Sequence, residues 1–169
     1  EMWDEEDGFF YDVLRFPDGA ATRLKVRSIV GLLPLAAVVV FEEDILARLP
    51  TFGKNARRFL ARHSDLIANM HLPGTPGVGN RRMLSIVDEG KLRRILARML
   101  DESEFFGPYG IRALSRYHLD HPYVFQHGGQ EYRVAYVPGD SDSGMFGGNS
   151  NWRGPVWMPI NALLHGALL

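Results

Sequence analysis

GMFGGNSNWRGPVWMPINALL, residues 144–164, is the stretch of this chain that bears most directly on its fold and function. Its glycines at 147, 148 and 154 argue against regular structure, because glycine loses more conformational entropy than any other residue in a helix or strand. The stretch therefore predicts a loop as far as residue 154 and a helix that begins near Trp157 or Pro159.

The side chains of this loop are those that a sugar ring requires. Trp152 and Trp157 offer flat apolar faces, and Asn151 and Arg153 bring hydrogen-bonding groups beside them. A sugar has an apolar face surrounded by hydroxyl groups, so rigid aromatic rings next to polar side chains suit it well. The loop predicts carbohydrate as the ligand class, with these four residues as contacts.

Two carboxylates are further candidates for the sugar site. Asp142 lies on the same loop, where its carboxylate would either accept paired sugar hydroxyls or stabilise a turn through its own backbone, and both interpretations stay open. Asp12 follows three aromatic residues and is predicted to line a pocket. The acidic residues at positions 4 to 7 are predicted to form a solvated surface instead.

Neither a metal nor a cofactor is predicted. The segment 140–144 resembles the start of a calcium loop, but Asn151 stands at the twelfth position, where a bidentate Glu is needed, so a structural calcium ion is only a minor alternative. His118, His121 and His127 lie close in sequence without the Glu or Cys that would complete a zinc set. The segment 74–79 follows a predicted helix and lacks the spacing of a phosphate-binding loop.

Composition excludes several classes of partner. The 169 residues fit one domain, and 19 basic against 20 acidic residues give a net charge of −1, so we expect no nucleic-acid partner. No apolar run reaches the roughly 18 residues that a membrane span needs, so we expect no membrane partner. Without cysteine the chain suits a reducing compartment, and we expect it to be cytoplasmic.

Hydrophobic patterning predicts a mainly α domain that carries a small β-hairpin. We expect a buried helix over 24–49 with a kink at Pro34, and an amphipathic helix over 52–70. Asp88 is a candidate N-cap for a helix that runs to Leu100, and a short helical segment is expected over 109–117. Two β-type runs, 123–126 and 132–137, flank a Gly-Gly turn and predict the hairpin.

The same residues carry a family resemblance. The segment 151–157, with Asn161-Ala162-Leu163 after it, resembles the W-R-G-P-[IV]-W-x-x-x-N-x-L signature of glycoside hydrolase family 63 and its bacterial relatives, including mannosylglycerate hydrolase-like proteins. The segments 2–12 and 27–35 resemble two further stretches of that family. The resemblance covers the chain from end to end, although many relatives carry Tyr where this chain has Asn151.

The resemblance implies an (α/α)6 barrel, of which residues 1–169 would be a part truncated at both ends, with a long substrate-facing loop. It implies an inverting glycosidase that hydrolyses α-glucosidic or α-mannosidic bonds in an oligosaccharide or a glycosyl-glycerate. Trp152 and Trp157 would then line the subsite of the cleaved sugar. The family motifs for the catalytic acid and base do not occur between residues 1 and 169, so no catalytic residue is assigned and the fragment alone is expected to be inactive.

Two other classes of function stay open. One is a non-catalytic carbohydrate-binding helical module that uses Trp152 and Trp157 as a stacking platform. The other is a helical interaction scaffold, which would need an exposed apolar groove. The presence or absence of two carboxylates in the longer reading frame would separate an enzyme from a binding module. The sequence leaves the sugar, its linkage and the oligomeric state open.

Overall fold

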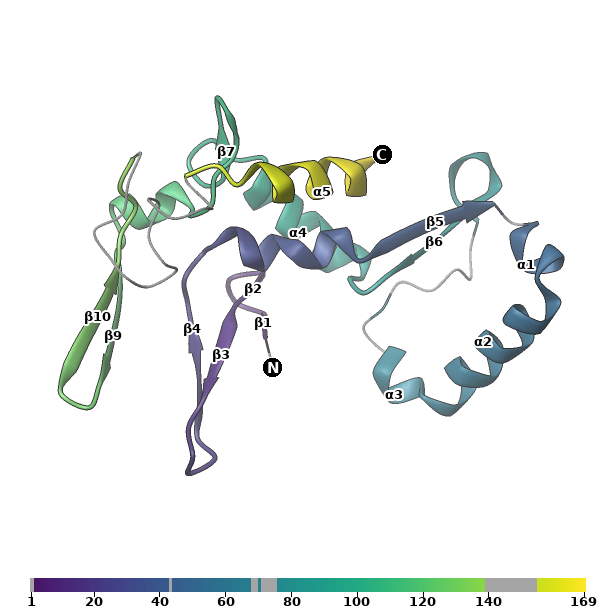
Figure 1. Ribbon diagram of the computed structural model, residues 1–169, viewed down its shortest axis with the longest axis horizontal. Coiled ribbons are helices and arrows are strands. Elements are labelled where there is room, and N and C mark those ends of the chain that lie inside the picture. Colours follow the sequence, from purple (N-terminus) through teal and green to yellow (C-terminus); the bar gives the residue numbers. More distant parts are fainter. Residues whose placement is uncertain (1, 43, 68–69, 71–75, 139–154) are drawn as a thin grey trace. The chain divides into compact units, whose positions relative to one another are not determined.

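The computed structural model describes residues 2–42, 44–67, 70, 76–138 and 155–169. The chain divides into two compact units, one made of residues 1–33 and 93–169 and the other of residues 34–92. Figure 1 shows the elements of both units along the sequence.

Four antiparallel hairpins form the strands of the first unit. Their pairs are β1 (Trp3–Asp4) with β2 (Phe9–Phe10), β3 (Asp12–Arg15) with β4 (Ala21–Leu24), β7 (Phe106–Gly107) with β8 (Gly110–Ile111), and β9 (Tyr123–His127) with β10 (Gln130–Val134). In the last hairpin His127 pairs with Gln130, so Gly128 and Gly129 alone form the turn. Both have positive φ angles, 60° and 77°, as a two-residue type I′ turn requires.

Short helices complete the first unit. They are the 3₁₀ helices η1 (Ile29–Ala36) and η3 (Arg116–Leu119) and the α-helices α4 (Glu89–Met99) and α5 (Met158–Leu168), of which η1 and α4 continue into the second unit. Apolar side chains from the hairpins and helices share one core. The most buried of them are Phe9, Ile29, Leu32, Ile95, Met99, Phe105 and Leu164. The rings of Phe9 and Phe105 stack with their centroids 5.7 Å apart.

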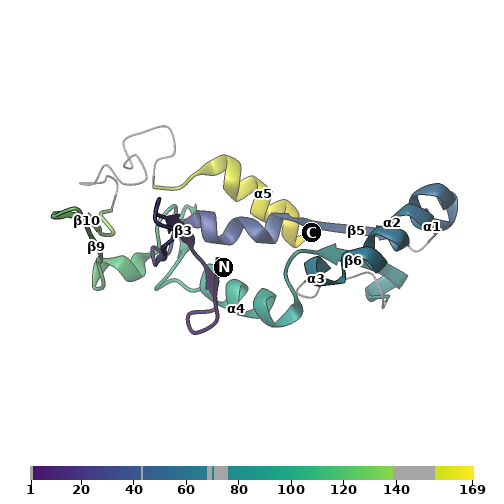
Figure 2. The same cartoon turned by 90° about the horizontal axis from the view of Figure 1, so that it is seen from below.

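The second unit consists of one hairpin and the helices inserted between its strands. Strand β5 (Val38–Glu42) pairs antiparallel with β6 (Arg81–Ser85), and Val38 lies opposite Ser85. Between these strands lie the helices α1 (Ile45–Arg48), α2 (Pro50–Arg62), α3 (Ser64–Ile67) and η2 (Val78–Asn80). Figure 2 shows α1 and α2 in succession after β5.

Several predicted elements are confirmed. The hairpin of β9 and β10 forms, α2 and α3 cover most of 52–70, and α5 begins at Met158. Helix α4 starts directly after Asp88, whose Oδ1 accepts the backbone N–H of Lys91 at 2.8 Å, so Asp88 caps the helix as predicted.

Two predicted helices are wrong. The stretch 24–49 is divided among a strand end, η1, β5 and α1, because residues 38–40 are three consecutive valines whose branched side chains favour a strand. The stretch 109–117 contains β8 and the start of η3. A helix cannot pass through Gly110, whose φ is 127°, and Ser115 caps η3 by accepting the Tyr117 N–H.

The predicted (α/α)6 barrel, and with it the mainly α fold class, is wrong. The described residues form a mixed α/β structure with five two-stranded antiparallel sheets, and strands alternate with helices along much of the chain. The barrel rested on the family resemblance, and the mainly α class rested on apolar content counted as helical period. Strands as short as β1, β2, β7 and β8, two residues each, leave too few positions for an alternating pattern to be seen.

Candidate functional site

Trp157 is the predicted sugar contact that the structure describes best. It is half-buried and lies immediately before α5, at the N-cap position. Its carbonyl oxygen accepts the backbone N–H of Asn161 at 3.1 Å and the side-chain Nδ2 of Asn161 at 3.0 Å. The first turn of α5 therefore holds the backbone of Trp157.

Both ends of the predicted sugar-binding loop are attached to one short stretch of the first unit. Before the loop, the N–H of Tyr136 donates to the carbonyl of His118 at 3.1 Å. After it, the carbonyl of Pro155 accepts the N–H of Ala113 at 2.8 Å, and the N–H of Ile111 donates to Asn161 Oδ1 at 2.6 Å. Residues 111–118 thus hold both flanks of the loop.

Four of the six predicted site residues lie outside the described residues: Asp142, Asn151, Trp152 and Arg153. Besides Trp157, the described candidate is Asp12, which is exposed at the start of β3. It lines an open cavity of about 530 Å³ whose other walls are Met2, Val13 and Arg15. Trp157 is not part of that lining, so this cavity does not unite the two described candidates.

A second, larger cavity lies beside the hairpin of β3 and β4. Its volume is about 700 Å³, and it is lined by Val13, Ala21, Thr22, Arg23, Lys25 and Tyr123. An aromatic ring, a hydroxyl and two cations beside small apolar groups make it a mixed surface of a size common among ligand pockets. The sequence prediction missed this cavity, because its lining comes from strands 100 residues apart.

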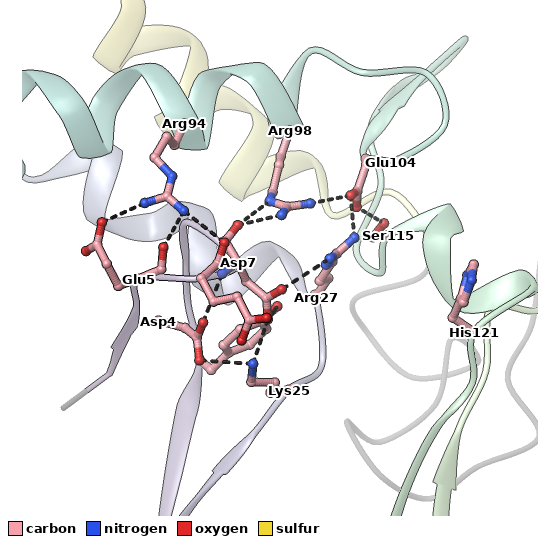
Figure 3. Close-up of polar contacts among 12 residues, drawn as sticks. Asp4, Glu5, Asp7, Lys25, Arg27, Arg94, Arg98, Glu104, Ser115 and His121 are labelled. Carbon is pink, nitrogen blue, oxygen red and sulfur yellow. Dashed lines mark hydrogen bonds and ion pairs between the residues drawn. The ribbon is translucent and has the colours of Figure 1, made fainter.

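The polar centre of the first unit is a buried carboxylate, Glu104. One of its oxygens accepts the guanidinium groups of Arg27 at 2.5 Å and Arg98 at 2.6 Å, and the other accepts the Ser115 hydroxyl at 2.5 Å. Figure 3 shows these side chains converging from three segments of the chain. Arg27 also lies over the ring of Tyr117, 3.7 Å from its centroid. With both oxygens occupied by donors of the protein itself, Glu104 has the environment of a structural ion pair.

A second group of charges adjoins it at the N-terminal hairpin. Lys25 Nζ lies 3.1 Å from Asp4 and 3.0 Å from Asp7, and the Asp7 N–H donates to Asp4 at 2.9 Å (Figure 3). That N–H, together with Lys25, lowers the pKa of Asp4 against the opposing effect of burial. Burial raises the pKa of Tyr11, whose hydroxyl donates to Asp7, to about 12.

These contacts correct the prediction of a solvated acidic surface for Asp4 and Asp7, whereas Glu5 and Glu6 are exposed as predicted. Asp4 is only 4% exposed, and the carbonyl of Asp7 accepts Arg98 Nε at 3.0 Å. The signal that sequence reasoning overlooked is the aromatic company of the acids, since Trp3 and Phe9 flank them and are both buried. The partners themselves lie about 20 and 90 positions away, where no local pattern can show them.

His118 is buried and carries no free acceptor for a metal. Its Nε2 accepts the N–H of Arg27 at 2.9 Å, and its Nδ1 lies 2.9 Å from the carbonyl oxygen of His121, so Nδ1 holds the proton of a neutral ring. Burial lowers the pKa of His118. Within the described residues, no set of three or more His, Cys, Asp or Glu side chains is arranged to hold a metal ion.

The helices of the described residues are at most 13 residues long. None of them is both long and apolar enough to cross a bilayer.

The described residues thus define a mixed α/β protein of short hairpins whose first unit contains a buried ion-pair network. No model of a known protein family matches the chain. The chain is similar to the uncharacterized protein YMR196W of Saccharomyces cerevisiae, with 45% identity over 168 residues. The match covers 99% of this chain but 15% of the relative, so the chain spans about a seventh of the length of the curated relative it matches.

These findings correct the identification made from the sequence. The assignment to glycoside hydrolase family 63 or a mannosylglycerate hydrolase-like protein is wrong, since the relative is uncharacterized and the structure has no helical toroid among its described residues. The short motif around Trp157 is not sufficient to identify the family.

Proposed function

We propose that this chain is a carbohydrate-binding part of a longer protein, and that Trp157 is one of its sugar contacts. The observation that supports this is the attachment of both flanks of the loop 139–154 to residues 111–118, through Tyr136 on one side and Pro155 on the other. Those residues are themselves fixed by Ser115 and the buried Glu104. Flanks that are already fixed reduce the conformational entropy that ligand binding costs.

The composition of the loop indicates the ligand. Trp152 and Trp157 supply aromatic faces, and Asn151, Arg153 and Asp142 supply hydrogen-bonding groups. Since this chain matches only 15% of the relative's length, the chemistry of the longer protein is a separate matter. That it hydrolyses α-glucosidic or α-mannosidic bonds stays a prediction, as do its cytoplasmic location and its lack of nucleic-acid partners.

Isothermal titration calorimetry of the chain with methyl α-glucoside and with methyl α-mannoside tests the proposal. We expect saturable binding that Trp157→Ala weakens by about tenfold or more, since stacking on an aromatic ring is worth roughly 1 to 2 kcal/mol. Tyr109→Ala is the matched control, because Tyr109 is 85% exposed on the β7–β8 turn. Absence of heat with both sugars at millimolar concentration would reject sugar binding.

A second experiment, with the same sugars, tests for catalysis in the longer protein. Proton NMR of the full reading frame with these sugars would show release of free glucose or mannose if the protein is a hydrolase. Binding without release would support the non-catalytic carbohydrate-binding module.

A further inference from the structure

Asn161 makes an unusual set of contacts for a residue in the first turn of a helix. Its Oδ1 accepts the backbone N–H of Ile111 at 2.6 Å, and its Nδ2 donates to the carbonyl of Ile111 at 3.1 Å and to the carbonyl of Trp157 at 3.0 Å. A side-chain amide offers two N–H donors and a carbonyl oxygen with two lone pairs. Asn161 uses both donors and accepts one bond at the oxygen, and all three partners are backbone atoms.

The pairing with Ile111 copies a strand contact. In an antiparallel ladder, a residue exchanges both its N–H and its C=O with one neighbour. The amide of Asn161 gives and takes the same two bonds, so it stands in for one residue of a third strand beside β8. The side chain of Asn161 thereby attaches helix α5 to β8. Asn161 and Ile111 are 50 positions apart in the sequence.

Gly110 is the residue that permits this approach. A Cβ atom at position 110 would lie 2.8 Å from Asn161 Oδ1 and 3.2 Å from Val156 Cγ1, and the φ of Gly110 is 127°. A side chain at position 110 would collide with the amide of Asn161. It would also be strained, because residues other than glycine rarely adopt a φ of this sign. Gly110 and Asn161 therefore act together as a contact between β8 and the segment 156–161, which we call the latch.

We infer that Asn161, seated against Gly110 and Ile111, is a positioning residue that sets the orientation of Trp157 for sugar binding. This rests on the proposed function only in its last step. Because the Trp157 carbonyl is held by the same amide that is bonded to β8, loss of the amide leaves this carbonyl its bond from the Asn161 backbone N–H but removes its link to β8. Exposed residues of α5 such as Leu163, which is 54% exposed, do not share this role.

Fluorine NMR of the chain labelled with 5-fluorotryptophan tests the latch without any ligand. The chain has three tryptophans and so gives one resonance for each, and the Trp157→Phe variant assigns the one in question. We expect Asn161→Ala and Gly110→Ala both to shift and broaden the Trp157 resonance while that of Trp3 stays in place. Asn161→Asp, which keeps the acceptor for Ile111 but loses both donors, is expected to shift it as well, and Leu163→Ala is expected to leave it unchanged.

Sugar titration of the same variants completes the test. If the wild-type chain binds methyl α-mannoside or methyl α-glucoside, we expect Asn161→Ala to lose on the order of tenfold in affinity, a difference of about 1.4 kcal/mol, and Leu163→Ala to bind as the wild type does. A Trp157 resonance that stays sharp and unshifted in Asn161→Ala would overturn the latch. A shifted resonance in a chain that binds neither sugar would keep the latch and reject the proposed function instead.

Discussion

Two ion pairs of the same chemistry lie in very different surroundings in the two units. In the first unit, Arg27 lies 2.5 Å from Glu104, and the two side chains are only 10% and 9% exposed. In the second unit, Arg48 lies 3.4 Å from Asp44, and the side chains are 73% and 62% exposed. Water screens the second pair and hardly reaches the first, so the two should differ widely in what their loss costs.

Replacing Glu104 is the most severe way to test this contrast. Glu104→Ala removes the nearer carboxylate of the buried Arg27 guanidinium, which keeps Asp7 at 3.7 Å, and takes a bond from Arg98 and from Ser115. Removal of one member of a buried pair costs about 3 to 5 kcal/mol, and we expect a loss of that size in the free energy of unfolding by urea. Glu104→Gln, which keeps the shape and loses the charge, should lie between this variant and the wild type. A loss below about 1 kcal/mol for Glu104→Ala would show that the cluster is not a source of stability.

The pH dependence of the free energy of unfolding tests what the buried His118 contributes to the first unit. Because burial lowers the pKa of His118, the unfolded chain takes up a proton near its ordinary pKa of about 6.5 while the folded chain does not. Stability that depends on the neutral ring is thus complete above pH 6.5 and is lost as the pH falls below it. We expect the urea midpoint to decrease between pH 7 and pH 5.

Three carboxylates with lowered pKa values do not contribute in this range. The pKa values of Asp4, Asp88 and Asp101 are lowered from an ordinary value of 3.8, so these groups change charge at lower pH. His118→Gln should flatten the dependence between pH 5 and 7. An equal slope in the variant and the wild type would remove His118 as its cause.

The sequence was sufficient for elements that carry their own local signals. Asp88 before an apolar helical period, and two glycines between β-type runs, each predicted an element with the correct boundaries to within three residues. These signals succeed because the stabilising contact lies within a few residues, as in the bond from Lys91 N–H to Asp88.

The candidate site depended on contacts that no local pattern contains. Arg27 and Glu104 are 77 positions apart, and Asn161 and Ile111 are 50 apart, so neither pair could be inferred from spacing. That the aromatic and glycine-rich segment presents side chains stays a prediction, and the stretch 111–118 that holds its flanks could not be inferred from the sequence. Composition indicated what the loop could bind, and only the fold shows what supports it.

Helix capping offers an intermediate test in the second unit. Asp88→Ala removes the acceptor of the Lys91 N–H, at 2.8 Å, and the partner of the Lys91 ammonium, at 2.7 Å. These two contacts also lower the pKa of Asp88. We expect a loss of about 1 kcal/mol in the free energy of unfolding. Asp88→Asn retains the capping oxygen and should lose less, whereas equal losses in both variants would assign the effect to charge rather than to the cap.

The exposed pair of the second unit should give the smallest effect. Arg48 and Asp44 are four positions apart around the start of α1, and such pairs contribute about 0.3 to 0.5 kcal/mol. Arg48→Ala is therefore expected to change the free energy of unfolding by no more than about 0.5 kcal/mol, and 0.5 M NaCl should abolish the difference because exposed charges are screened. The double variant with Asp44→Ala should then resemble either single variant. A loss that approached that of Glu104→Ala would mean that exposure does not govern the strength of these pairs, and the contrast between the two units would fail.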